Sequence, residues 1–195
     1  ACGSIGAGDK GKHFHEEIVD RGLLNQSVAL GNALIDMYVK CGMLLEAQDV
    51  LEGLPIRDVI SWSTLIAGYA KQEGRGHEAL RCFEEMQREG LYPDEVTFTG
   101  ILKSCGSIKS LNKGKKIHDE LKARGLLFEK DIMLGTALVD MYAKCGLLSK
   151  ARQVLEELPV RNIVSWSALI VGYVQQEQAH EALNCFERML REGLS

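Results

Sequence analysis

The chain contains little proline, few aromatic residues and no long apolar run. Its 195 residues include three prolines and 6% aromatic side chains, which argues against a β-sandwich and against a proline-rich disordered chain. No run of 18 apolar residues occurs, so the sequence predicts no transmembrane helix and no membrane partner.

The chain also lacks an initiator methionine and the features of a signal or transit peptide at its first residues. It begins and ends inside repeating segments, so we interpret it as a piece of a longer protein. Any targeting segment is then expected outside it.

Signatures of catalysis and of metal binding are missing as well. There is no Cys-x-x-Cys for zinc, so the zinc site of a deaminase, which needs Cys-x-x-Cys in addition to His-x-Glu, is not predicted. The stretch Gly6–Gly11 spells Gly-x-Gly-x-x-Gly, but no strand is predicted before it, as a dinucleotide site requires. His15 aligns with His118 as a packing position, and metal binding by His13 and His15 is the alternative. The sequence predicts no catalytic residue, no metal and no cofactor.

The six cysteines occupy equivalent positions of a repeat. They form the matched pairs Cys2 and Cys105, Cys41 and Cys145, and Cys82 and Cys185. Most lie on apolar helical faces, where a free cysteine behaves as a small hydrophobic residue. We therefore expect free thiols and a reducing compartment.

Internal repetition determines the predicted architecture. Gly31–Glu73 aligns with Gly135–Glu177, with more than half of the positions identical. Inside each copy, apolar residues recur with helical spacing, Cys41-Gly42 ends one helix and Pro55 ends the next. No window alternates with period two. The sequence predicts an all-α fold of helix–turn–helix units that bury their apolar faces against their neighbours.

The pattern divides the chain into six segments that form a single array. They are a partial unit at 1–27, a short unit at 28–58, a unit at 59–94, a longer unit at 95–131, a second short unit at 132–162 and an incomplete unit at 163–195.

These units resemble the pentatricopeptide-repeat family in its plant arrangement of alternating P, L and S variants. DVISWSTLIAGYAKQEGRGHEALRCFEEMQREGLYPD resembles the P variant, and PDEVTFTGILKSCGSIKSLNKGKKIHDELKARGLL resembles the L variant. VALGNALIDMYVKCGMLLEAQDVLEGLPIRD and IMLGTALVDMYAKCGLLSKARQVLEELPVRN are similar to the S variant. The resemblance makes 1–27 a partial L-type repeat and 163–195 an incomplete P-type repeat. It implies a right-handed superhelical solenoid in which each unit reads one nucleotide of single-stranded RNA.

The resemblance also implies which residues read the bases. Base specificity falls on the fifth residue of each first helix and on the residue that closes the unit: Asn32 with Asp58, Ser63 with Asp94, Thr99 with Asp131, Thr136 with Asn162, and Ser167 without a partner in the chain. By the family rule these units read U, G, an ill-defined G, A and a purine. Second-position residues that would sandwich the bases are Ile60, Val96, Met133 and Val164, whereas Ala29 is small for that role.

Three lysines are candidate phosphate contacts. Lys40, Lys71 and Lys144 each follow the fifth-position residue by eight positions, which places them near the same helix face. Ser107 and Gln175 occupy this place in other units, so the stripe is incomplete. A solvated surface position is the alternative for each lysine. Trp62 and Trp166 fall on the apolar stripe, so we expect core packing rather than base stacking.

The two S-type copies differ at the places that matter for reading. Their first helices differ in polarity only at Asn32 and Thr136, and their closing residues are Asp58 and Asn162. These exchanges alter the donors and acceptors offered to a base edge. Neutral drift at exposed positions is the alternative.

The preferred interpretation is a sequence-selective RNA-binding module, not an enzyme, of an organellar C-to-U editing or processing factor in a mitochondrion or chloroplast. Its expected partners are single-stranded RNA and other editing factors. The alternative is a protein-interaction scaffold resembling a tetratricopeptide array, and the net charge of −4 favours it because nucleic-acid binders usually carry a basic patch.

Overall fold

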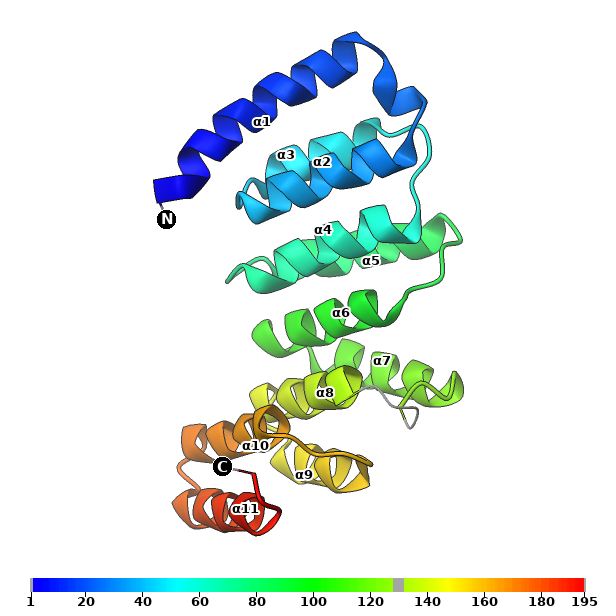
Figure 1. The fold of residues 1–195 in the computed structure, drawn as a ribbon. Coiled ribbons are helices and arrows are strands. Elements are labelled where there is room, and N and C mark those ends of the chain that lie inside the picture. The colour runs from blue at the N-terminus through cyan, green and yellow to red at the C-terminus, as the bar shows by residue number, and fades with distance from the viewer. Residues whose placement is uncertain (1, 128–131, 195) are drawn as a thin grey trace. The chain divides into compact units, whose positions relative to one another are not determined.

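The computed structural model describes residues 2–127 and 132–194, except for the side chains of residues 2–7 and 9. Within these residues the chain is helical and contains no strand, which confirms the all-α class (Figure 1). The elements are α1 (Cys2–Asp20), the 3₁₀ turn η1 (Leu23–Asn25), α2 (Val28–Lys40), α3 (Leu44–Gly53), α4 (Val59–Lys71), α5 (Gly76–Arg88), α6 (Glu95–Ser107), α7 (Leu111–Ala123), α8 (Ile132–Lys144), α9 (Leu148–Glu157), α10 (Ile163–Gln175) and α11 (Ala179–Arg191). None of the described helices is both long and apolar enough to cross a bilayer.

The chain divides into two compact halves, Ala1–Gly100 and Ile101–Ser195, which we describe separately. In each half consecutive helices pair as hairpins, such as α2 with α3 and α4 with α5 in the N-terminal half, and α8 with α9 and α10 with α11 in the C-terminal half. The first helix of one hairpin also packs on the first helix of the next, as α2 does on α4 and α8 on α10.

Glycine makes the turn inside the short hairpins. The φ of Gly42 is +75°, a left-handed conformation that costs a residue without a Cβ little, and the Met43 amide donates to the Tyr38 carbonyl at 2.9 Å. Gly146 repeats this geometry between α8 and α9 with a φ of +79°. The same turn between α6 and α7 uses Lys109, with a φ of +53°.

Proline and a capping side chain join one hairpin to the next. Leu54, just before Pro55, is extended and ends α3, as steric clash with a following proline requires. Asp58 then caps α4 by accepting a hydrogen bond from the Ser61 amide at 2.9 Å, and Asn162 caps α10 from the Ser165 amide at 2.8 Å.

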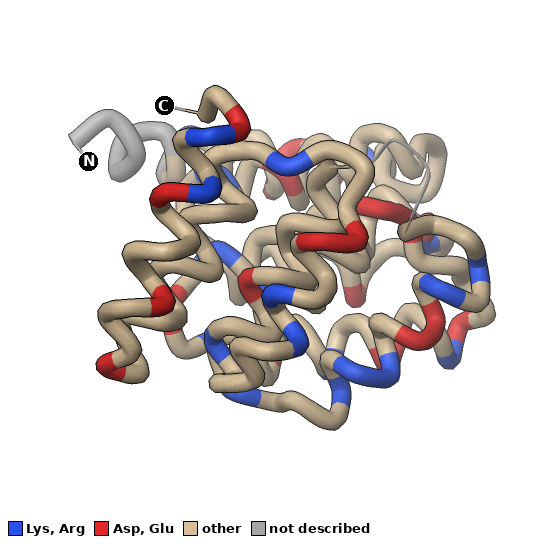
Figure 2. Tube along the Cα trace, turned by 90° about the horizontal axis from the view of Figure 1, so that it is seen from below, with Lys and Arg blue, Asp and Glu red and all other residues tan. Residues whose placement is uncertain are grey.

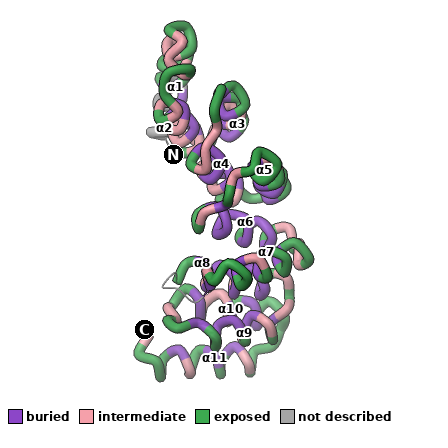
Figure 3. Tube along the Cα trace, turned by 90° about the vertical axis from the view of Figure 1, so that its right-hand side faces the viewer, coloured by how far each residue is buried: buried purple, intermediate pink, exposed green. Residues whose placement is uncertain are grey.

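The core of the N-terminal half lies between α2, α3, α4 and α5, where the buried faces of the helices meet (Figure 3). Its most deeply buried large side chains include Ile35, Tyr38, Leu51, Leu65, Ile66, Tyr69 and Met86. Gly31 permits the close approach of α2 and the end of α3, because a Cβ there would lie 2.5 Å from Leu54 Cδ2.

The core of the C-terminal half is built in the same way from α7 to α11. Leu138, Met141, Leu155, Trp166 and Leu169 are fully or almost fully buried. His118 is also buried, and its Nδ1 lies 2.8 Å from the Tyr142 hydroxyl. In the N-terminal half, His15 and Tyr38 make the equivalent contact at 3.1 Å.

The first segment differs from the repeat pattern. Gly6 aligns with Lys109, which lies in the turn between α6 and α7, yet Gly6 lies inside the continuous helix α1.

Candidate nucleic-acid interface

Four large apolar side chains are exposed at equivalent places, each at the second residue of a first helix. Ile60 is 58% exposed on α4 and Val96 54% on α6, while Met133 on α8 and Val164 on α10 are both 63% exposed. Single exposed apolar residues are ordinary on protein surfaces. These four, however, recur at the same helix position, and such repeated apolar side chains are suited to contact flat aromatic rings. Ala29 holds this place on α2 and is exposed as well.

The predicted pair Asn32 and Asp58 is in direct contact. The Asn32 amide Nδ2 donates toward both carboxylate oxygens of Asp58, at 3.2 Å to Oδ1 and 3.3 Å to Oδ2. Both side chains are half-buried. Burial raises the pKa of Asp58, but hydrogen bonds from Ser61, Asn32 and Ile60 outweigh burial and leave this pKa below its usual value.

The other predicted fifth-position residues differ in accessibility. Ser63 is 5% exposed and donates to the Ile60 carbonyl at 3.3 Å, and Thr99 is 8% exposed. The hydroxyl of Thr136 is buried and has no hydrogen-bond partner among the described residues. Ser167 is half-buried beside a depression described below. Asp131, the predicted partner of Thr99, lies outside the described residues.

The closing residues also cap the helices that follow them, a structural role that was not predicted from the sequence. Asp94 caps α6 by accepting from the Thr97 amide at 2.8 Å, in the way that Asp58 and Asn162 cap α4 and α10. Aspartate and asparagine are among the preferred N-cap residues. Capping alone therefore accounts for their presence at these junctions, and the Asp/Asn pattern by itself does not distinguish a base-reading groove from a peptide-binding one.

A depression of about 240 Å³ lies between α8 and α10 in the C-terminal half. Lys144, Val164 and Ser167 line it together. A predicted phosphate contact, a predicted sandwiching residue and a predicted base-specifying residue thus meet at one place, although they come from two hairpins. Lys144 is held by an ion pair with Asp140 at 2.7 Å.

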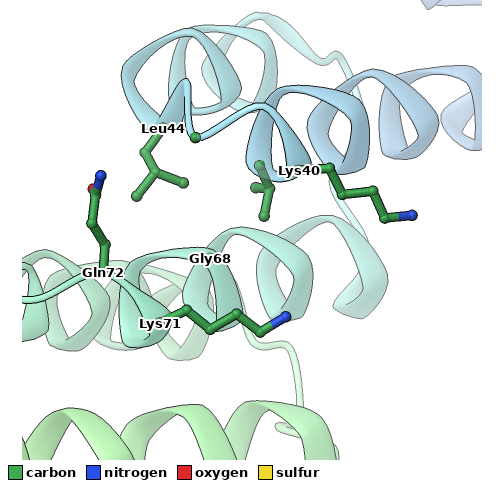
Figure 4. Close-up of a pocket in the computed structure, with 7 residues that line it drawn as sticks. Lys40, Leu44, Gly68, Lys71 and Gln72 are labelled. Carbon is green, nitrogen blue, oxygen red and sulfur yellow. The ribbon is translucent and has the colours of Figure 1, made fainter. Parts of the chain in front are cut away.

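A second depression, in the N-terminal half, has a volume of about 350 Å³ and lies between α2, α3 and α4. Lys40 and Lys71 line it with Val39, Gly42, Leu44, Gly68 and Gln72. In Figure 4 the two lysine side chains extend from neighbouring helices to the same side. Lys40 pairs with Asp36 at 2.6 Å, an exposed contact that contributes about 1 kcal/mol or less. A phosphate can therefore replace the carboxylate as partner at small cost.

The two tryptophans belong to the core, as expected. Trp62 is 3% exposed and Trp166 1%. Their indole nitrogens donate to Glu89 at 2.8 Å and to Glu192 at 3.0 Å. Each glutamate also pairs with an arginine from the segment before the first helix, Arg57 and Arg161 respectively. In each hairpin, the glutamate therefore links the tryptophan of the first helix to the arginine of the loop that precedes that helix and carries the closing residue.

Charge and cysteine chemistry add no catalytic centre to the described residues. Basic and acidic residues are interspersed along both halves (Figure 2). Cys41, Cys82, Cys105, Cys145 and Cys185 are free, and burial raises the pKa of Cys82 and of Cys105 to about 12, so both remain thiols. Among the described residues no three His, Cys, Asp or Glu side chains are grouped to hold a metal.

Ser61 is a functional candidate that sequence reasoning missed. It lies under the Asn32–Asp58 pair and contacts both residues. A signal was present: a serine or threonine stands three residues after Asp58, Asp94 and Asn162, which is the spacing from an N-cap to the third helical residue.

These features define a helical-repeat protein with exposed apolar side chains at one repeated position of its first helices. A model described as the PPR repeat family matches residues 57–107, and one described as PPR repeat matches residues 32–57, 136–163 and 164–194. The chain belongs to the pentatricopeptide-repeat family.

Relatives and solved structures agree with this assignment. A chloroplastic pentatricopeptide repeat-containing protein of Arabidopsis thaliana is 40% identical over 99% of this chain and 31% of its own length. A mitochondrial one from the same plant is 41% identical over 97% of this chain and 33% of its own length. The chain thus spans about a third of these curated relatives.

Two solved structures share the fold. The pentatricopeptide repeat protein PPR10, in complex with an 18-nt psaJ RNA element, matches 100% of this chain and 29% of its own with a TM-score of 0.77 and 21% identity. The PPR domain of Arabidopsis thaliana protein-only RNase P 1, in complex with tRNA, matches 86% of this chain and 91% of its own with a TM-score of 0.66 and 17% identity. The expected helical-hairpin repeat fold is confirmed.

Proposed function

We propose that this chain is a module that binds single-stranded RNA with sequence selectivity, one nucleotide per hairpin. The observation that carries the proposal is the meeting of Lys144, Val164 and Ser167 at one depression between consecutive hairpins. An apolar side chain, a hydroxyl and a cation are the groups that a nucleotide needs for its ring face, its base edge and its phosphate. Solved relatives of the same fold are complexes with RNA.

The five readable units are expected to take U, G, an undefined base, A and a purine in 5′ to 3′ order. The first of these rests on Asn32 with Asp58 and the fourth on Thr136 with Asn162. Asn32 carries both a donor and an acceptor, whereas Thr136 carries a buried hydroxyl that has no hydrogen-bond partner among the described residues. The two copies therefore present different hydrogen-bonding groups on nearly identical helices.

Binding is expected to be sensitive to salt although the net charge is −4. Lys40, Lys71 and Lys144 lie at equivalent ends of first helices, and the phosphates are proposed to replace Asp36 and Asp140 as partners of Lys40 and Lys144. Lysines that neutralise phosphates release counterions, so the affinity falls as the salt concentration rises.

We further propose that this module is part of an organellar factor for C-to-U editing or RNA processing. The factor would act in a chloroplast or a mitochondrion, with other editing factors as its partners. One of its relatives is named as a chloroplastic protein and another as a mitochondrial protein. Within the chain we assign binding and no catalysis.

The direct test is a binding titration of the full chain at low salt with short RNAs. A probe carrying U, G, any base, A and a purine in order should bind more tightly than a scrambled probe of the same composition. The matched DNA probe and a Val164→Asp variant are the controls, since the variant places charge where a ring should lie. Equal affinity for both RNAs, or binding of peptides in preference to RNA, would refute the proposal.

A further inference from the structure

Ser61 occupies the junction between the two residues proposed to read the first base. It is the third residue of α4 and is completely buried. Its Oγ lies 2.6 Å from Asn32 Oδ1 and 2.8 Å from Asp58 Oδ1, and it accepts a hydrogen bond from the Asp58 amide at 3.2 Å. One hydroxyl therefore contacts both members of the pair.

The surroundings of Asn32 determine which way its amide points. The Asp58 carboxylate accepts hydrogen bonds only, so the Asn32 NH₂ group must face it. The Asn32 oxygen then lies on the side of the Ser61 hydroxyl, which donates to it. Rotating the amide by 180° would place an oxygen about 3 Å from the carboxylate and lose the hydrogen bonds to Asp58, and the Ser61 hydroxyl would have to turn its proton away from Asn32.

The orientation decides what remains for a base. With one N–H directed to Asp58 and one lone pair directed to Ser61, Asn32 retains one N–H and one lone pair in a fixed order. Uracil offers a carbonyl oxygen beside its ring N–H, whereas cytosine offers a ring nitrogen acceptor beside an amino group. An amide free to rotate can satisfy either base; a fixed amide favours one.

We propose that Ser61 is a positioning residue that holds the Asn32 amide in one orientation and so sets the discrimination between uracil and cytosine at this hairpin. The inference rests on the proposed function and adds to it a residue that does not itself touch the base.

The second copy of the repeat supplies a matched control. Ser165 is equally buried, its amide donates to Asn162 Oδ1 at 2.8 Å, and its Oγ accepts from the Asn162 amide at 3.1 Å. Its hydroxyl donates to the Asn162 backbone carbonyl at 2.9 Å instead of to a fifth-position side chain. Ser61 and Ser165 thus share the capping task, but within the described part of the chain Ser61 bonds to a fifth-position side chain whereas Ser165 does not.

The experiment compares Ser61→Ala, Ser61→Thr and Ser165→Ala in the full chain. Binding is titrated with two RNAs that differ only in U or C at the Asn32 position, and thermal unfolding is followed for each variant. The side-chain amide resonances of Asn32 are recorded by NMR without RNA.

Ser61→Ala should lower the ratio of U to C affinity by about two- to tenfold, the range expected for one hydrogen bond. It should also shift and broaden the Asn32 amide resonances. Ser61→Thr, which keeps the hydroxyl as Thr97 does on α6, should restore the ratio. Ser165→Ala should reduce thermal stability similarly and leave the U to C ratio unchanged.

Two results would overturn the inference: an unchanged U to C ratio in Ser61→Ala, or an equal loss of that ratio in Ser165→Ala. If the parent chain does not distinguish RNA bases at all, the proposed function fails and the inference with it. The Asn32 resonances then show separately whether the amide is held.

Discussion

The Asn32 amide on α2 donates to the carboxylate of Asp58, 3.2 Å away at the start of α4. This contact ties the residue proposed to read a base at one hairpin to the residue that caps the first helix of the next. Under the proposed function, a substitution at a closing position is therefore expected to change helix stability and base selection together, and the two effects have to be measured separately.

Asn162→Asp should move the preference of the Thr136 hairpin from A toward G. The substitution keeps an oxygen to accept from the Ser165 amide, so the N-cap is retained, but it replaces an NH₂ group with a second acceptor. Titrations with RNAs that carry A or G at this position measure the change.

Asn162→Ala is the control for that experiment. It removes the cap and should cost about 0.5–2 kcal/mol in the free energy of unfolding, whereas Asn162→Asp should leave this quantity nearly unchanged. A large loss of stability in Asn162→Asp would contradict the assigned capping role.

Lys71→Gln should weaken RNA binding at all sequences alike and lower the slope of log affinity against log salt by about one. The chain itself carries glutamine at the equivalent position, Gln175, so the helix tolerates the change. Binding isotherms at several salt concentrations give the slope. Lys122→Gln on the second helix α7 serves as the comparison, and an equal reduction there would remove the special role of Lys71.

Leu80 and Leu183 offer a matched test of burial. They are equivalent residues of the two His-Glu-Ala-Leu copies, yet Leu80 is 4% exposed and Leu183 63%. Leu80→Ala should destabilise the chain by about 2–5 kcal/mol, whereas Leu183→Ala should cost less than about 1 kcal/mol. Denaturant unfolding of both variants checks this, and equal losses would show that the faces of α5 and α11 are equally covered.

Acid should destabilise the chain through His118. Burial lowers the pKa of this imidazole to about 4, so the unfolded chain takes up its proton first, near pH 6.5. The stabilising contribution is complete above pH 6.5 and is lost as the pH falls toward 4. Between pH 7 and pH 5 the loss amounts to about 2 kcal/mol.

The variant His118→Asn should flatten that part of the pH dependence. Unfolding free energies measured from pH 7 to pH 4.5 in both proteins give the difference. If the parent and the variant have parallel profiles, His118 is not the group responsible.

Much of the fold could be predicted from the sequence because its signals are local. Gly42 and Pro55 end helices for steric reasons that do not depend on the rest of the chain. Apolar residues such as Leu34 and Tyr38 recur with helical spacing, and the repeat itself shows that each hairpin needs neighbours. The repetition does not extend to Gly6, which lies inside α1 although the aligned Lys109 lies in a turn.

The candidate site was only partly predictable, because it depends on contacts between residues that are distant in the sequence. The family resemblance singled out Ile60, Val96, Met133 and Val164 as second-position residues, and the structure has all four exposed. Spacing did not reveal that Ser63 and Thr99 are nearly buried. The ion pairs of Lys40 and Lys144 join residues four positions apart, which a helix places side by side.

The sequence by itself determined the all-α class, the hairpin turns and the repeated positions, because helical periodicity and the residues that end helices act over only a few neighbouring residues. Only the tertiary structure decided which side chains meet across hairpins. Asn32 and Ser61 are 29 positions apart, and Lys144 and Ser167 belong to different hairpins. Packing between helices, a non-local interaction, brings each pair together.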